Sequence, residues 1–230
     1  MKNVKLILLF FVSTLFFSCQ NEPTKSDVDQ PTTFANFYVR FMEAERRIKA
    51  TAIFDQGKDE KNTTSLKIEN GVFFHNANMD EREIQKVGIR YSYEMGGKFS
   101  DSFKFRFTDP VKGKMNYNLI MNPIHNVSIS NGISKSKGMV ISWEGNPLNE
   151  NESLVFLIKG EKGNPIHFEI KGKTETSQIS IPAGKTKTLT LGTAKIEIVR
   201  KQSIVTEEPN FIAHCNSEFY SSVTDTNVVP

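Results

Sequence analysis

The stretch Ser102-Phe103-Lys104-Phe105-Arg106-Phe107-Thr108-Asp109-Pro110 alternates between polar and aromatic residues with a period of two. Successive side chains of a strand point to opposite faces, so the three phenylalanines share one face, opposite Lys104 and Arg106. A solvent-facing row of phenylalanines would promote aggregation, so this face is expected to line a core. Asp109-Pro110 is a turn signal that ends the strand.

The same alternation marks the region after residue 33. Apolar and polar residues alternate in Phe37–Phe41 and in Ile48–Phe54, which indicates two strands or one long bent strand. A helix is the alternative, because the linking segment Glu43–Arg47 consists of good helix formers. Asn70-Gly71 then separates two short apolar runs and supplies the residues that a type I′ turn requires, so a hairpin is expected there.

Asn122-Pro123 is expected to separate two modules. After it the strands are shorter, and turn signals lie between nearly all of them. Seven short strands within roughly 75 residues are typical of a β-sandwich. They are predicted at Val127–Ser130, Met139–Trp143, Leu154–Ile158, Ile166–Ile170, Gln178–Ile181, Thr188–Leu191 and Lys195–Val199. No cysteine pair is present for an immunoglobulin-type bridge, so only the architecture is indicated.

Composition excludes several classes of protein. Hydrophobic residues make up 38% and charged residues 24%, which suits a globular fold. The chain has no Gly-X-Y repeat, no heptad pattern and no second long apolar run, so collagen, coiled coil and polytopic membrane protein are excluded. Two cysteines cannot form a disulfide framework or a Cys-rich zinc site.

The first nineteen residues have the pattern of an export signal. Lys2 and Lys5 form a basic start, and Leu6–Phe17 is an apolar run too short for a bilayer, which needs roughly 20 residues. Ser18-Cys19 follows directly and resembles the lipobox of bacterial lipoproteins, although Phe16 replaces the usual small or β-branched residue. In that family the cysteine carries a diacylglyceryl group and begins the mature chain. The alternative is an ordinary secretory signal with a chance cysteine.

Removal of residues 1–18 would take Lys2 and Lys5 away and leave 27 of the 29 basic residues against 26 acidic ones. A balance this close to neutral gives no reason to expect a nucleic-acid partner. Membrane attachment would come from acyl chains on Cys19, since each buried methylene contributes roughly 0.8 kcal/mol. Gln20–Thr33, which contains two prolines, is expected to be a tether.

The second half carries another resemblance. Ile141–Leu148, Ile181–Gly184 and Ile198–Lys201 resemble segments of uncharacterised Gram-negative lipoproteins with Ig-like β-sandwich modules. The expected fold is therefore all-β, with two tandem antiparallel β-sandwich modules. The expected order is a lipoprotein signal peptide at 1–18, a lipidated tether at 19–33, an N-terminal β-sandwich module at 34–122, an Ig-like module at 123–202, and a tail at 203–230 with a candidate strand returning to the first module.

Candidates for chemistry are few. His214 lies beside Cys215, but neighbours on a strand point to opposite faces, so a buried thiol is favoured over a Cys–His dyad. Asp55–Glu60 has too few correctly spaced oxygens for calcium and is expected to be a solvated turn, as is Asn149–Glu152. No two histidines lie within four residues of each other, and no phosphate-binding, cofactor or zinc-protease motif is present.

The aromatic residues allow two interpretations. Tyr91 and Tyr93 could form a sugar-binding platform, but they share their face with Ile89 and Met95, which favours a core. Trp143 is likewise expected to be a core anchor, and Phe156 is assigned to the same interior. His167 alternates with Ile166 and Phe168 and is expected to face solvent.

The sequence therefore predicts a non-catalytic binding or structural lipoprotein without cofactor or metal. We expect it in the cell envelope, anchored through Cys19 to the outer membrane, on the periplasmic or exposed side. A protein or glycan is the expected partner. A glycan-binding accessory lipoprotein is the alternative, and an envelope hydrolase is the third reading.

Overall fold

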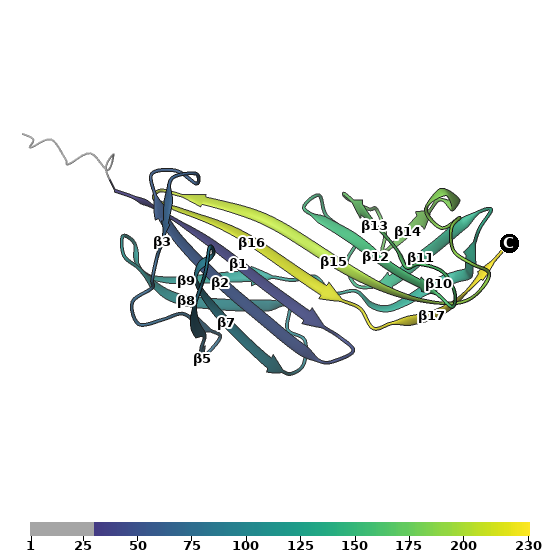
Figure 1. Cartoon of the computed structure of the whole chain (residues 1–230), viewed down its shortest axis with the longest axis horizontal. Coiled ribbons are helices and arrows are strands. Elements are labelled where there is room, and N and C mark those ends of the chain that lie inside the picture. The colour runs from purple at the N-terminus through teal and green to yellow at the C-terminus, as the bar shows by residue number, and fades with distance from the viewer. Residues whose placement is uncertain (1–29) are drawn as a thin grey trace, which may run out of the picture. The chain divides into compact units, whose positions relative to one another are not determined.

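The computed structural model describes residues 30–230, of which Pro31–Pro230 form one compact unit (Figure 1). The regular elements in this region are β-strands, apart from one 3₁₀ helix, η2 (Ala183–Lys185). The all-β prediction is therefore confirmed. The signal peptide, Cys19 and most of the predicted tether lie outside the described residues.

In the first half of the described chain, two sheets face each other. Ring contacts join them, with Phe37 and Phe105 centred 4.7 Å apart and Phe54 and Phe107 4.8 Å apart. The larger sheet contains β1 (Thr32–Met42), β2 (Arg47–Gly57), β3 (Thr63–Ser65), β6 (Asp80–Ile84) and β7 (Gly88–Gly96). The smaller sheet has the order β5-β4-β8-β9 and contains β4 (Phe73–Phe74), β5 (Ala77–Asn78), β8 (Ser102–Asp109) and β9 (Gly113–Ile120). This arrangement is sandwich-like.

Strands β1 and β2 settle the choice between strand and helix in favour of two strands. They pair antiparallel along their whole length, and a tight turn joins them, with Arg46 at a φ of 50° and its N–H bonded to the carbonyl of Glu43. β1 begins at Thr32, and Thr33 is fully buried, so the last two residues of the predicted tether are part of the sheet.

The hairpin predicted at Asn70-Gly71 does not form. Both residues have the expected positive φ, 63° and 72°, but the segments on either side do not pair with each other. Ile68 is buried and its N–H donates to the Tyr91 hydroxyl at 2.9 Å, so a side chain satisfies this backbone group. After the turn, Phe73–Phe74 pairs with β8 in the smaller sheet instead.

The second half contributes eight strands. They are β10 (His125–Ser134), β11 (Gly138–Glu144), β12 (Glu152–Gly160), β13 (Ile166–Lys171), β14 (Gln178–Ile181), β15 (Gly192–Glu208), β16 (Phe211–Tyr220) and β17 (Thr224–Val229). Six of the seven strands predicted here are present. The strand predicted at Thr188–Leu191 is wrong, because η2 and the turns after it bond locally, as in Leu189 N–H to the Thr186 carbonyl.

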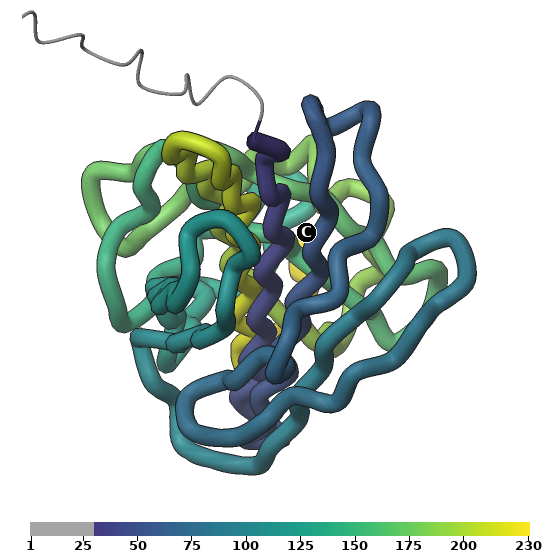
Figure 2. The backbone as a smooth tube through the Cα atoms, turned by 90° about the vertical axis from the view of Figure 1, so that its left-hand side faces the viewer, coloured from purple at the N-terminus to yellow at the C-terminus, as the bar shows by residue number. Residues whose placement is uncertain are grey.

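Strand β15 links the two halves of the larger sheet. Ala194–Gln202 pairs with β12, and Val199–Glu208 pairs with β16, which lies in turn beside β1 (Figure 2). β1 with β16, and β10 with β17, are parallel pairs. The prediction that all strands pair antiparallel is therefore wrong for these two pairs of strands. The partners are joined by long stretches of chain rather than by hairpins, so no tight turn imposes an antiparallel direction.

Burial follows the predicted strand parity in the second half. Trp143 and Phe156 are buried in the same core cluster, whereas His167 is exposed. Tyr91 is fully buried, as the core interpretation requires, and Tyr93 is half-buried against the same core.

Candidate ligand-binding groove

A row of mainly charged side chains crosses the outer face of the larger sheet. The buried neighbours of the row, such as Val39 and Phe219, point to the opposite face. The strand register places the row in the order Glu94, Lys49, Arg40, Glu218, Lys201, Ser153 and Lys171, on β7, β2, β1, β16, β15, β12 and β13. Opposite charges meet along it, with Lys49 3.4 Å from Glu94 and Arg40 3.0 Å from Glu218.

Glu218 is the centre of this row. Its Oε2 accepts hydrogen bonds from the Tyr38 hydroxyl at 2.5 Å and from the Tyr220 hydroxyl at 3.1 Å. Arg40 donates to the same oxygen, and its guanidinium carbon lies 4.7 Å from the centroid of the Tyr220 ring. Burial and the Glu218 carboxylate raise the pKa of Tyr38, and burial raises the pKa of Tyr220 to about 12. Both hydroxyls therefore remain donors, and the cluster is internally satisfied.

A groove of about 480 Å³ lies beside this cluster. Its lining comes from β1, β12, β13, β15, β16 and the loop before β12, and consists of Tyr38, Glu150, Asn151, Glu152, Ser153, Glu169, Lys171, Lys201, Gln202, Ser203, Asn216, Ser217 and Glu218. The Ser153 hydroxyl donates to Glu169 at 2.7 Å, and this bond holds the pKa of Glu169 below its usual range. The groove thus presents Glu169 as a fixed, ionised acceptor near two lysines, Lys171 and Lys201.

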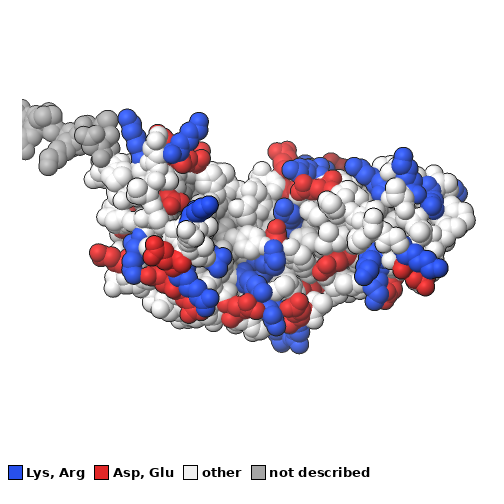
Figure 3. Space-filling view, viewed as in Figure 1, with Lys and Arg blue, Asp and Glu red and all other residues white. Residues whose placement is uncertain are grey.

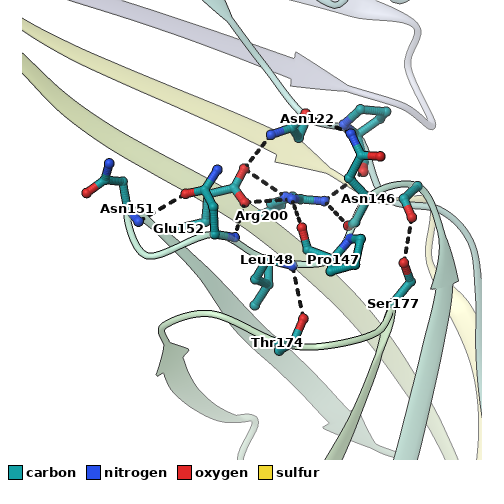
Figure 4. Close-up of polar contacts among 12 residues, drawn as sticks. Asn122, Asn146, Pro147, Leu148, Asn151, Glu152, Thr174, Ser177 and Arg200 are labelled. Atoms are coloured by element: carbon teal, nitrogen blue, oxygen red, sulfur yellow. Dashed lines mark hydrogen bonds and ion pairs between the residues drawn. The ribbon is translucent and has the colours of Figure 1, made fainter.

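Behind the groove, a buried ion pair holds the loops together (Figure 4). The side chains of Arg200 and Glu152 are 1% and 0% exposed, and their shortest contact is 2.6 Å. All five N–H donors of the guanidinium have partners. Two bonds go to Glu152, and the other three go to the carbonyls of Pro123, Asn146 and Pro147.

The Glu152 carboxylate is equally well satisfied. Besides Arg200, it accepts from the Asn122 amide at 2.8 Å and from the N–H of Asn149 at 2.8 Å. The prediction of a solvated turn at Asn149–Glu152 is therefore wrong for Glu152, because strand pairing brings β12 against Arg200 of β15. The sequence did contain one indication that Arg200 is buried. It follows Ile196 and Ile198 at every second position of the strand, and these two side chains point inward.

Cys215 and His214 do not meet, as strand geometry predicts. Cys215 is a buried free thiol, and burial raises its pKa. His214 points to the other face, where its Nε2 lies 2.8 Å from Glu60. The prediction of a solvated turn at Asp55–Glu60 is wrong for its first three residues, because Asp55–Gly57 is the end of β2 and pairs with β3. The turn begins after Gly57, and in it Asp59 accepts from the N–H groups of Lys61 and Asn62.

Within residues 30–230, no three His, Cys, Asp or Glu side chains are grouped so as to hold a metal ion. The part of the chain that the structure describes also contains no helix with the length and apolar character to cross a membrane. On the face seen in Figure 3, Lys and Arg are interspersed with Asp and Glu.

Comparisons with known proteins give no family. No protein-family model matches the chain, and no curated protein matches its sequence. Among solved structures, the chain is similar to the adhesin InvE of Yersinia pseudotuberculosis at a TM-score of 0.24 and 10% identity. The match covers 82% of this chain and 58% of that one, so the chain spans less than two thirds of the InvE structure. A TM-score this low carries no argument about function.

Proposed function

We propose that the protein is a lipid-anchored component of the cell envelope that binds a ligand in the groove without catalysis. The anchor is Cys19, placed at the end of the apolar run Leu6–Phe17 as in a lipobox, and the outer membrane is the proposed location. The bound ligand is a glycan. The polar groove beside Glu218 is the observation that carries the binding role.

The chemistry of the groove supports a polyhydroxylated ligand. Its walls offer carboxylates, amides and hydroxyls at short spacing, together with the edge of Tyr38. Sugar hydroxyls both donate and accept, so they can pair with Glu169 as acceptor and with Lys171 as donor. An apolar peptide would exclude water from these groups without offering them hydrogen bonds of its own, which is unfavourable.

Two observations favour binding over hydrolysis. A glycosidase needs one carboxylic acid whose pKa is raised so that it can donate a proton. In the groove, the hydrogen bond from Ser153 moves the pKa of Glu169 in the opposite direction. Glu152 also belongs to the groove lining, but both of its oxygens are engaged by Arg200 and its neighbours.

Anchoring is tested by the Cys19→Ala variant. Cells are fed an alkyne-labelled fatty acid, and label and membrane association are measured for both proteins. We expect wild type to carry the label and stay with membranes, and the variant to lose both. Equal membrane retention of the variant, together with an unlabelled wild type, would contradict the anchor.

Ligand binding is tested by titrating the full chain, purified in detergent, with maltohexaose, cellohexaose and chitohexaose. We expect one of these oligosaccharides to bind, and Glu169→Gln to weaken that binding about tenfold, because a hydrogen bond to a charged group is worth about 1.5–3 kcal/mol. Glu175→Gln is the matched control, since Glu175 is exposed and lies outside the groove. Equal affinities for the two variants, or no binding of any oligosaccharide, would refute the proposal.

A further inference from the structure

A second cavity lies on the outer face of the smaller sheet. It has a volume of about 530 Å³, and its lining contains no carboxylate. The lining residues are Asn70, Gly71, Phe73, Arg106, Phe107, Thr108, Lys114, Met115 and Asn116. This cavity therefore differs in charge from the groove on the larger sheet, which has four glutamates against two lysines.

Arg106 is the central side chain of this cavity. The register places it on β8 between Phe73 of β4 and Asn116 of β9. Its guanidinium carbon lies 5.4 Å from the centroid of the Phe73 ring, so the ring covers one side of the cation. The side chain is half-buried and belongs to the lining of the cavity.

The cations of the cavity are uncompensated. The Nε of Arg106 is buried without a hydrogen-bond partner. Neither Arg106 nor Lys114 forms an ion pair with any carboxylate among residues 30–230. Arg106 and Lys114 are the charged residues of the lining and both are positive, so the cavity attracts an anion.

The anion that this lining favours is an oxyanion. A guanidinium presents its N–H groups in a planar fork that matches the two oxygens of a carboxylate or phosphate, and Lys114 adds a second positive charge on the rim. Phe73 offers apolar surface to a carbon skeleton. The side-chain amides of Asn70 and Asn116 can form hydrogen bonds with hydroxyl groups of a ligand. Asn70 and Gly71 form a turn with positive φ at the edge of the cavity.

We propose that this cavity binds a small organic anion, through a carboxylate or phosphate held by Arg106 and Lys114. The cavity lies near the start of β1. Lys112, in the turn next to Lys114, contacts Glu208 of β15, and the N–H of Thr33 bonds to the carbonyl of Asn210 at 3.0 Å. The oxyanion has two possible sources, an acidic sugar or a phospholipid headgroup, which share this chemistry.

The test is calorimetric titration of the full chain, purified in detergent, with glucuronate, glycerol 1-phosphate and, as a neutral probe, methyl glucoside. We expect at least one of the two anions to bind and methyl glucoside not to bind. Tighter binding of glucuronate assigns the site to acidic sugars, and tighter binding of glycerol phosphate assigns it to headgroups. Arg106→Gln is expected to weaken anion binding at least tenfold.

Arg90→Gln is the matched control. Arg90 also has a buried Nε without a partner, but it lines neither this cavity nor the groove, so anion binding should be unchanged. Lys114→Gln replaces an exposed side chain, so it should fold normally and weaken binding by a few fold. The proposal is overturned if neither anion binds, or if Lys114→Gln and Arg106→Gln, both folded by circular dichroism, bind as wild type does.

Discussion

The two halves of the larger sheet close their cores by different means. In the first half, the ring of Phe37 lies 4.7–5.8 Å from the rings of Phe54, Phe105, Phe107 and Tyr117. In the second half, the core is largely aliphatic, and its base is closed by the buried pair of Arg200 and Glu152. Packed aromatic rings exclude water from the core of the first half, and a hydrogen-bonded ion pair does so at the end of the second.

The difference follows from what borders each core. The loops at Pro123 and at Asn146-Pro147 direct carbonyls inward, where no neighbouring strand can pair with them. Buried carbonyls need donors, which a phenylalanine cannot provide. Arg200 supplies donors to three carbonyls at once, and Glu152 neutralises its charge. A core bordered by loops therefore needs a polar closure, whereas one bordered by two facing sheets does not.

The aromatic half should be the more sensitive to a single truncation. Phe105→Ala removes a fully buried ring that lies 4.7 Å from Phe37 and 5.1 Å from Phe74. We expect a loss of about 4–5 kcal/mol in the free energy of unfolding, measured in urea. Lys104→Ala, at an exposed neighbouring position, should stay within about 0.5 kcal/mol. A loss below about 2 kcal/mol for Phe105→Ala would place it outside the range for buried aromatic residues.

The polar half should show strong coupling between its two charges. Arg200→Met leaves the Glu152 carboxylate buried and unpaired, and we expect a loss of about 3–4 kcal/mol. The double variant Glu152→Leu/Arg200→Met removes both charges, so it should cost clearly less than the sum of the single variants in a double-mutant cycle. If the losses of the two single variants add up to the loss of the double variant, Arg200 and Glu152 do not stabilise the protein as a coupled pair.

A smaller effect is expected at the edge of the same network. Asn122→Ala deletes one donor to Glu152 but leaves Arg200 in place, so the expected loss is about 1–2 kcal/mol. Asn118→Ala is the control, because its hydrogen bond with Ser102 is exposed and should contribute within about 0.5 kcal/mol. If the two variants had the same free energy of unfolding, the hydrogen bond from Asn122 would contribute no more to stability than an exposed one.

The smallest effect concerns pH in the aromatic half. Burial, with a contribution from Lys104, lowers the pKa of His75 below its ordinary value of 6.5. The unfolded state then binds more protons than the folded state just below that value, so stability is lost as the pH falls through 6.5. His75→Asn removes this dependence, and asparagine tolerates the φ of 53° at this position.

The measurement for His75 is the free energy of unfolding of wild type minus that of His75→Asn, followed from about pH 7.5 to about pH 5. We expect this difference to become less favourable to wild type as the pH falls. The exposed His167→Gln variant should track wild type throughout. A flat difference would show that His75 has the same pKa in both states.

Much of the fold could be predicted because strand parity is a local property of the sequence. Alternation placed Trp143 and Phe156 inside and His167 outside without knowledge of any partner strand. Register and strand direction are not local, so the parallel direction of the pairing between β1 and β16 was missed. The same holds for the groove, whose walls come from five strands and one loop.

The buried pair escaped prediction for a related reason. Glu152 lies in a polar segment after Pro147, which has the composition of a solvated turn. Its environment is set by the pairing of β12 with β15, and this brings Arg200 to it from 48 positions away. Only the position of Arg200 in an otherwise apolar inward series signalled an unusual site.

The position of β16 beside β1 has a consequence for the order in which the chain is made. β1 is translated well before β16, the strand that covers its second edge and ends at Tyr220. Until then β1 has one unpaired edge, flanked by the apolar side chains of Phe37 and Val39, which other chains could join. Contacts this distant in sequence also form slowly. The nascent chain therefore depends on being kept apart from its copies until β16 emerges.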